Sequence, residues 1–143
     1  MLTSTRFITS IYLCLLLAWK NNGLLTSSWL AKRVQTNPVV VRRLLALLRD
    51  AQLVHSEPGT QGGYRLAKSA EEISLWDIYQ AIMQRELYTE TNFAEDCPVA
   101  SQLDQALEPT FLMAEMSMGV TFEQTRLSDM LTRSLPRIEA SAA

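Results

Sequence analysis

The chain has 143 residues, of which 48% are hydrophobic and 20% are charged, so it is long enough for one domain with a buried core and too apolar for a disordered protein. Its net charge of −2 hides an uneven distribution: residues 1–68 carry nine Lys or Arg against two acidic residues, a net +7, and residues 69–143 carry four Arg against thirteen acidic residues, a net −9. A basic N-terminal part indicates binding to a polyanion, with an acidic C-terminal part that stays away from it. A scatter of solvated surface charge is the alternative.

The two cysteines, Cys14 and Cys97, are too few for a disulfide framework. Cys14 lies in the apolar run 11–19, where we expect a small core residue. That run is shorter than the roughly 20 residues that span a membrane. The sequence KNNG after it is typical of a helix end rather than of a signal-peptide cleavage site. We therefore expect a cytoplasmic protein without membrane contact.

Two helices are expected first. One begins at a serine or threonine cap near residue 5 and runs to about residue 20, with apolar residues on almost all sides, as in a buried scaffold helix. Residues 24 and 25 are expected to pair as a short strand with a later hairpin. The second helix covers about 27–34 after a cap at Thr26, Ser27 or Ser28, and it directs Lys32 and Arg33 outward.

A turn at residues 35–37 separates the second helix from a third, over about 38–51, which begins with a proline after a Thr36 or Asn37 cap. The helical spacing predicts a buried stripe made of Val41, Leu44, Leu45 and Leu48. The opposite face near the start of the helix carries Val39, Val40, Arg42 and Arg43. Arginine is the side chain that most often contacts guanine in the major groove, and valine methyl groups can contact thymine methyl groups. The alternative for the two arginines is a pair of solvated charges.

A β-hairpin is expected next, because residues 53–57 and 64–66 alternate like strands around the turn sequence PGTQGG. A nucleotide phosphate loop is the weaker hypothesis, since no Walker lysine follows and the next element is a strand. The order helix, turn, helix, hairpin predicts a winged helix-turn-helix. The predicted DNA-binding residues are Ser27, Ser28, Thr36, Asn37, Val39, Val40, Arg42, Arg43, Thr60, Gln61, Tyr64 and Arg65.

The C-terminal part is predicted to be helical. Ser74 caps a helix over about 75–84, residues 85–98 are polar and irregular, and a long helix covers 99 to about 123, where Pro109 predicts a kink or a break. A short last helix begins at Leu127. The long helix adjoins an already complete domain, so we expect it to pack against a second copy. Its predicted dimerisation residues are Leu103, Leu107, Phe111, Ala114 and Met118.

The predicted fold class is mainly α with a small β-wing. We expect residues 1–84 to form the winged helix DNA-binding domain and residues 85–143 the linker and C-terminal dimerisation helices.

Five runs resemble the Rrf2 family of bacterial winged-helix transcription regulators: TNPVVVRRLLALLRDAQLV, GTQGGYRLAK, ISLWDIYQAI, CPVASQLDQAL and RLSDML. The resemblance implies a homodimer formed through the long helix, which binds a pseudo-palindromic operator in double-stranded DNA, usually as a repressor. Members that bind an iron–sulfur cluster carry three cysteines between the fourth helix and the long helix, where this chain has only Cys97. We therefore expect no cluster, no metal and no other cofactor, and a closer likeness to the cluster-free, YwnA-like branch.

A sensing protein is the first alternative, in which thiol chemistry or a small-molecule effector, whose identity the sequence leaves open, controls DNA binding. Cys97 precedes a helix whose N-terminal dipole lowers a thiol pKa, whereas the acidic Glu95 and Asp96 raise it. The long helix also carries residues that could line a pocket or form an adaptable dimer core, namely Phe111, Met113, Met116 and Met118.

An enzyme is the second alternative. The one histidine, His55, lies on a predicted wing strand without an obvious nucleophile or carboxylate partner, and no metal-ligand spacing is present. We therefore expect no catalytic activity.

Overall fold

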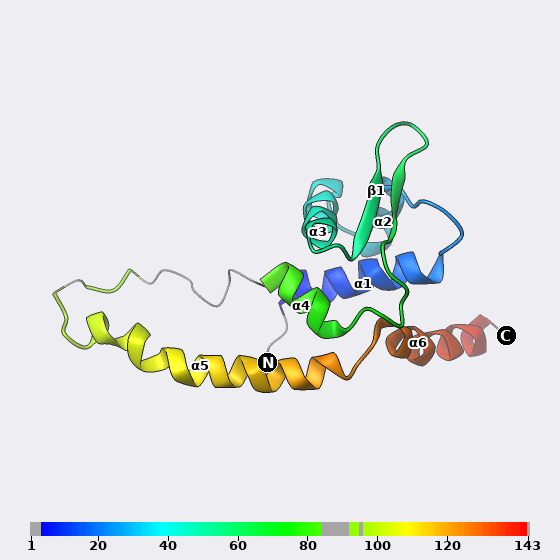
Figure 1. The fold of residues 1–143 in the computed structure, drawn as a ribbon. Helices are drawn as coiled ribbons and strands as arrows, with labels where there is room; N and C mark the ends of the chain where they lie inside the picture. The colour runs from blue at the N-terminus through cyan, green and yellow to red at the C-terminus, as the bar shows by residue number, and fades with distance from the viewer. Residues whose placement is uncertain (1–3, 84–91, 95, 143) are drawn as a thin grey trace.

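A computed structural model describes residues 4–83, 92–94 and 96–142. Helices and strands follow in the order α1 (Thr5–Trp19), α2 (Ser27–Val34), α3 (Pro38–Asp50), β1 (Val54–Glu57), β2 (Gly63–Leu66), α4 (Leu75–Met83), α5 (Ala100–Glu123) and α6 (Leu127–Ala142) (Figure 1). The predicted fold class is confirmed, because the chain is mainly helical and its sheet is one antiparallel hairpin. The irregular segment expected over 85–98 lies mostly outside the described residues.

α1 is the scaffold of the body, in contact with α2, α3, α4, α6 and β2. Its apolar residues point in most directions, and Leu13 and Cys14 are fully buried. Burying a leucine side chain contributes about 1.5–3 kcal/mol, so a helix surrounded in this way organises the core. Burial raises the pKa of the Cys14 thiol to about 12. The expectation that Cys14 is a core residue is therefore confirmed.

α2 and α3 form the predicted helix-turn-helix, and side-chain caps fix where each helix begins. The Thr26 hydroxyl accepts a hydrogen bond from the Trp29 N–H (3.2 Å), and the Asn37 amide oxygen accepts one from the Val39 N–H (2.8 Å). The inner face of α3 packs into the core with side chains no more than 2% exposed: Val41, Leu44, Leu45 and Leu48. Burial of this stripe turns the opposite face of α3 outward.

The wing is tied to the segment that precedes α2. β1 pairs antiparallel with β2, and Leu25 and Tyr64 exchange two backbone hydrogen bonds of 2.9 and 2.8 Å, which confirms the predicted short pairing. Gly63 permits this approach, because it adopts φ +155° and a Cβ there would lie 2.7 Å from the Leu25 carbonyl oxygen. The hairpin therefore stands beside the helix-turn-helix (Figure 1).

α5 extends beyond the body with its C-terminal end against α4, and α6 follows it and lies beneath α1 (Figure 1). α5 is continuous through Pro109, so the predicted break does not occur. A proline removes one backbone hydrogen bond and crowds the preceding turn, and this 24-residue helix has several turns on each side to continue it. Among the described residues, no helix combines the length and the apolarity that crossing a membrane requires.

α6 is longer than the short last helix predicted, with 16 residues. Its first turn is fixed by Asp129, whose carboxylate accepts a hydrogen bond from the Arg126 N–H (2.9 Å). Leu127 is fully buried and Leu131 packs against the same core. α6 therefore contributes to the core of the body.

Candidate nucleic-acid interface

The first half of α3 presents its side chains to solvent. Val39 and Val40 are 50% and 39% exposed, and Arg42 and Arg43 are exposed beside them. The same turns bury Val41 and Leu44 on the other side. A helix anchored on one face and bare on the other, with arginines near its start, has the form of a recognition helix for the major groove.

Two grooves flank the helix-turn-helix. One, of about 600 Å³, lies where α2 ends and α3 begins, and its lining includes Ser28, Thr36 and Asn37. The other, of about 460 Å³, lies between the start of α2 and the wing, and its lining includes Ser27, Thr60 and Tyr64. The structure thus brings half of the predicted DNA-binding residues into two adjacent grooves.

The remaining wing residues are placed differently. Gln61 and Arg65 are exposed on the hairpin but line neither groove. Tyr64 is half-buried, and its backbone bonds to Leu25 give it a structural role besides any contact of its ring. Glu57 also lines the groove beside the wing and adds negative charge there. Glu57 pairs with Gly63 at the tip end of the hairpin, so its carboxylate disfavours a phosphate in this groove.

Two basic residues of α2 were missing from the predicted DNA-binding set. Lys32 lines the groove between α2 and α3. The Arg33 guanidinium lies over the Trp29 ring, 3.6 Å from its centroid, which holds the cation at the surface. The outward position of both residues was predicted, but the closeness of Lys32 to Thr36 and Asn37 depends on how α2 packs against α3.

The sequence interpretation of His55 was wrong in one respect. Its Nε2 lies 3.5 Å from a carboxylate oxygen of Glu57, two residues along β1. Residues i and i+2 of a strand point to the same side of the sheet, so the pairing follows from the strand. The opposite residue on β2 is Arg65. His55, Glu57 and Arg65 thus form a polar surface on the wing strands.

Cys97 lies just before α5. The backbone N–H groups of Ala100 and Val99 donate hydrogen bonds to its sulfur, and these lower the pKa of the thiol. The lowering expected at a helix N-terminus is therefore present, whereas Glu95, one of the two residues expected to oppose it, lies outside the described residues. Cys97 is thus a thiol with an increased thiolate fraction at a position that reagents can reach, in contrast to the buried Cys14.

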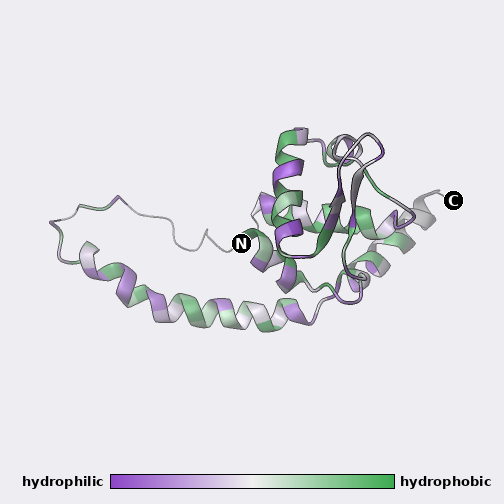
Figure 2. Cartoon of the chain, turned by 45° about the horizontal axis from the view of Figure 1, so that its top comes forward, coloured by the Kyte–Doolittle hydropathy of each residue, from purple (hydrophilic) through white to green (hydrophobic). Residues whose placement is uncertain are grey.

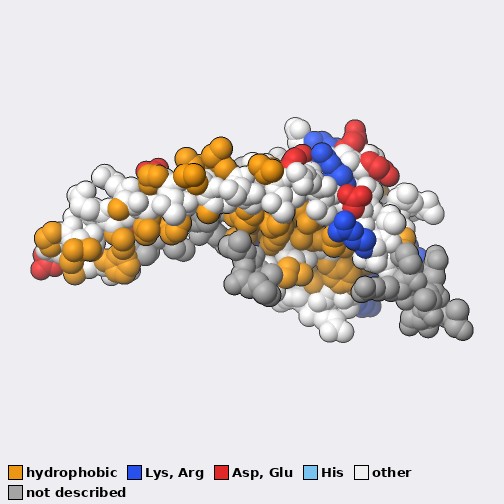
Figure 3. Space-filling view, turned by 90° about the horizontal axis from the view of Figure 1, so that it is seen from below, with side chains coloured by type: hydrophobic (Ala, Val, Ile, Leu, Met, Phe, Trp, Pro, Cys, Tyr) orange, Lys and Arg blue, Asp and Glu red, His pale blue; other side chains and the backbone are white. Residues whose placement is uncertain are grey.

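α5 has two apolar faces. One packs against the body of its own chain, where Gly119 is buried and Met118 and Phe122 contact the core. Leu103 and Leu107 are half-buried, and Phe111 and Ala114 are exposed. The other face is a bare stripe, with side chains 54–70% exposed: Leu112, Met113, Met116 and Val120. Figure 2 shows apolar residues on several sides of α5, and Figure 3 shows apolar side chains gathered along it.

A buried α3 stripe, an outward basic face and a hairpin held beside them define a winged helix-turn-helix protein of the DNA-binding type. The chain belongs to the Rrf2 family, whose model, described as an iron-dependent transcriptional regulator, matches residues 3–133. It is therefore a transcriptional regulator, as the sequence resemblance predicted.

Relatives share this class. YwnA of Bacillus subtilis, a candidate HTH-type transcriptional regulator, is 35% identical over 108 residues, which cover 74% of this chain and 80% of YwnA. The HTH-type transcriptional regulator IscR of Cereibacter sphaeroides is 28% identical over 135 residues, covering 93% of this chain and 87% of IscR. The structure of CymR, the global cysteine regulator of B. subtilis, shares the fold with a TM-score of 0.68 at 21% identity, over 94% of this chain and 98% of CymR.

The iron in the family description does not fit the residues of this chain. The sequence has two cysteines, and one of them is sealed in the core with a pKa of about 12. Within the described residues, no group of three or more His, Cys, Asp or Glu side chains is positioned to hold a metal ion. An iron–sulfur cluster held by thiolates needs more ligands than Cys97 supplies.

Proposed function

We propose that this regulator is a cytoplasmic homodimer that represses transcription by binding a pseudo-palindromic operator, and that it has no catalytic activity. The observation that carries the proposal is the anchored and outward-facing α3, which lies in the basic part of the chain with the wing beside it. The relatives named above, which are regulators, support the same function.

In this proposal α3 reads bases and its surroundings hold the backbone. Val39, Val40, Arg42 and Arg43 face the base edges of the major groove. The hydroxyl and amide groups of Ser27, Ser28, Thr36 and Asn37 contact phosphates on either side. Thr60, Gln61, Tyr64 and Arg65 bring the wing to the neighbouring backbone or minor groove. Base contacts supply specificity, whereas the net +7 of residues 1–68 supplies affinity that depends on salt.

The dimer forms through α5. The bare stripe over Leu112–Val120 adds to the predicted residues Leu103, Leu107, Phe111 and Ala114, whereas Met118, also in the predicted set, already packs against the body of its own chain. An apolar helix face without a partner in its own chain is stabilised by a second copy, and a two-fold axis then presents two α3 helices to two half-sites. The acidic residues 69–143 lie on the side away from the DNA. Residues 1–84 act as the reading domain and 85–143 as the linker and dimerisation part.

Selection from random duplex DNA tests this proposal. Repeated rounds of binding should enrich an inverted repeat whose half-sites are one helical turn apart, or a multiple of it. The same repeat is expected upstream of genes that the protein regulates. Recovery of unrelated sequences, or of a motif without two-fold symmetry, would overturn the proposed dimeric operator binding.

A thiol sensor is the second candidate, favoured by the accessible Cys97 and the backbone hydrogen bonds to its sulfur. Oxidation of Cys97 at the start of the dimer helix would then change DNA affinity. Treatment with hydrogen peroxide should weaken or strengthen operator binding by the wild type and leave the Cys97→Ser variant unaffected. Equal responses of both proteins would exclude the thiol as the sensor.

A further inference from the structure

The segment before α4 and the segment between α5 and α6 pair with each other like two short strands. The Leu75 N–H donates to the Thr125 carbonyl oxygen (2.9 Å), and the Leu127 N–H donates to the Ile73 carbonyl oxygen (2.8 Å). Ser74 and Arg126 form the bridge between these bonds. Two chain segments about fifty residues apart are thus joined through their backbones.

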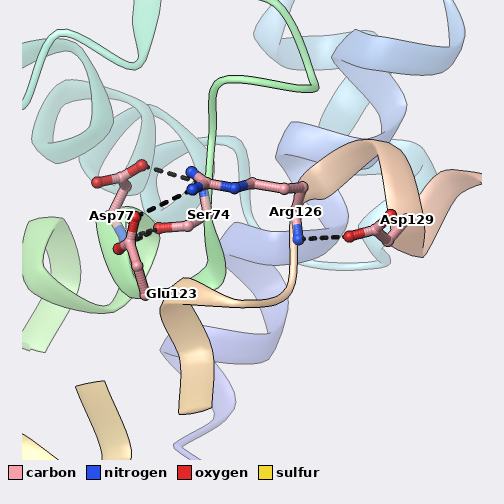
Figure 4. A network of polar contacts seen from close by, with 5 residues as sticks. All are labelled: Ser74, Asp77, Glu123, Arg126 and Asp129. Atoms are coloured by element: carbon pink, nitrogen blue, oxygen red, sulfur yellow. Dashed lines mark hydrogen bonds and ion pairs between the residues drawn. The ribbon is translucent and has the colours of Figure 1, made fainter. Parts of the chain in front are cut away.

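Side chains close the same junction (Figure 4). The Ser74 hydroxyl donates to the Glu123 carboxylate (3.0 Å), and the other oxygen of that carboxylate lies 3.3 Å from the Arg126 guanidinium. Ser74 also accepts a hydrogen bond from the Asp77 N–H (3.0 Å), and Asp77 accepts one from the Ser74 N–H (2.9 Å), which completes a capping box on α4. Ser74 is fully buried, so its hydroxyl is committed to these two bonds.

Close packing continues the junction along α5. A Cβ at Gly119 would lie 3.0 Å from the Trp76 ring, so the absence of a side chain lets α5 lie directly on α4. Trp76 stacks on Tyr79 with ring centroids 5.1 Å apart. Tyr79 in turn meets Phe7 of α1 and Phe122 of α5, at 5.5 and 6.0 Å. The C-terminal end of α5 is therefore fixed to the body by hydrogen bonds, an ion pair and aromatic packing together.

We infer that this junction, formed by Ser74, Trp76, Gly119, Glu123 and Arg126, determines which spacing of operator half-sites the dimer accepts. The inference rests on the proposed dimeric function. α4 packs against α3 on one side and against α5 on the other. The second copy binds on α5. The angle between α4 and α5 at the junction therefore determines where the recognition helix α3 lies relative to that second copy. One base pair rises about 3.4 Å, so a displacement of a few ångströms at α3 changes the preferred spacing.

The junction residues are positioning residues, since none of them lies on α2, α3 or the wing. Altering them should change the spacing preference without changing how one half-site is read. Gly119→Val places a side chain against Trp76 and moves α5 from α4. Glu123→Gln removes the ion pair and weakens the bond to Ser74 without adding volume. Glu71→Gln is the matched control, because it removes the same charge from an exposed position outside the junction.

The test measures the affinity of each full-length variant for inverted repeats whose spacers differ by one base pair, and for a single half-site, with the dimer verified by sedimentation. For wild type and Glu71→Gln we expect one preferred spacing. For Gly119→Val we expect a different preferred spacing, or a preference reduced about tenfold, with half-site affinity within about twofold of wild type.

Glu123→Gln should also reduce the preference for the wild-type spacing. This variant provides the test of the inference if Gly119→Val does not fold. Dimeric variants that keep the wild-type spacing preference would overturn the inference and leave the proposed function intact. A wild type that binds none of the duplexes would overturn the proposed function, and the inference with it.

Discussion

Arg43 and Arg49 lie on the same helix in different surroundings. Arg43 is exposed in the first half of α3, next to Val39 and Val40. Arg49 lies at the opposite end, where its guanidinium is 3.4 Å from the Asp50 carboxylate. Only the first position suits base readout, because a recognition helix contacts bases with its N-terminal residues.

Substitution of these arginines tests that difference. Arg43→Ala should reduce discrimination at one operator position by about 1–3 kcal/mol, measured by competition among duplexes with single base changes. Arg49→Ala should leave the discrimination unchanged. If Arg43→Ala instead weakens all duplexes equally, Arg43 contacts a phosphate.

The two cysteines should differ in reactivity with pH. The lowered pKa of Cys97 gives it more thiolate than an ordinary cysteine at the same pH, so a maleimide should modify it at lower pH than a free thiol. Cys14, with a pKa of about 12, should react only after unfolding. Mass spectrometry of wild type and Cys97→Ser measures both. Rapid modification of native Cys97→Ser would contradict the burial of Cys14.

At the scale of elements, the wing depends on a close approach of two backbones. Gly23 and Gly63 have nearly the same φ, +154° and +155°, but only Gly63 has a carbonyl oxygen where a Cβ would lie. Gly63→Ala should therefore lower the free energy of unfolding by about 1–3 kcal/mol more than Gly23→Ala does. Urea denaturation of the two variants measures the difference. Equal losses would mean that backbone strain alone matters at Gly63.

The bare stripe on α5 gives a prediction about assembly. Val120 is 65% exposed, so Val120→Glu should leave the fold of one chain intact and place a charge in the proposed dimer interface. We expect a monomer in sedimentation equilibrium and at least about a tenfold loss of affinity for an inverted repeat. Thr132→Glu, an exposed change on α6, is the control. A dimeric Val120→Glu protein would contradict the assignment of this face.

Local elements could be predicted from the sequence, because their causes are local. The caps at Thr26, Asn37 and Ser74 and the α3 stripe follow from residue types at fixed spacing. A short pairing of residues 24 and 25 with the hairpin was predicted, whereas Tyr64 as the partner was not. The junction between α4 and α5 could not be predicted, since Ser74 and Glu123 are 49 residues apart and neither forms a motif with the other. The start of α6 at Leu127 was predicted, whereas its length was underestimated.

For the candidate site, the sequence indicated the outward residues of α3 and the wing but not how they group. The grooves that join Ser28 to Thr36 and Ser27 to Thr60 arise from the packing of α2 against α3 and the wing. The sequence also did not predict that the exposed apolar residues of α5 form one stripe. Apolar residues surround that helix, and only the packed body shows which of them are already covered.

At the scale of the whole molecule, the charge is divided along the chain, with +7 in residues 1–68 and −9 in residues 69–143. The basic part contains α2, α3 and the wing, and the acidic part contains α5 and α6. Attraction to DNA is thereby confined to one part of the molecule, and repulsion by the acidic part favours the orientation in which α3 meets the groove.

The most direct measurement is the affinity of the wild-type protein for its selected operator and for a scrambled duplex, by fluorescence anisotropy over a range of salt concentrations. Both affinities should fall linearly on a logarithmic plot, by on the order of 10³ between 50 and 200 mM salt for about six phosphate contacts. The operator should remain at least about 10³-fold preferred. Binding that salt does not weaken, or equal affinity for both duplexes, would contradict sequence-specific recognition by α3 and the wing.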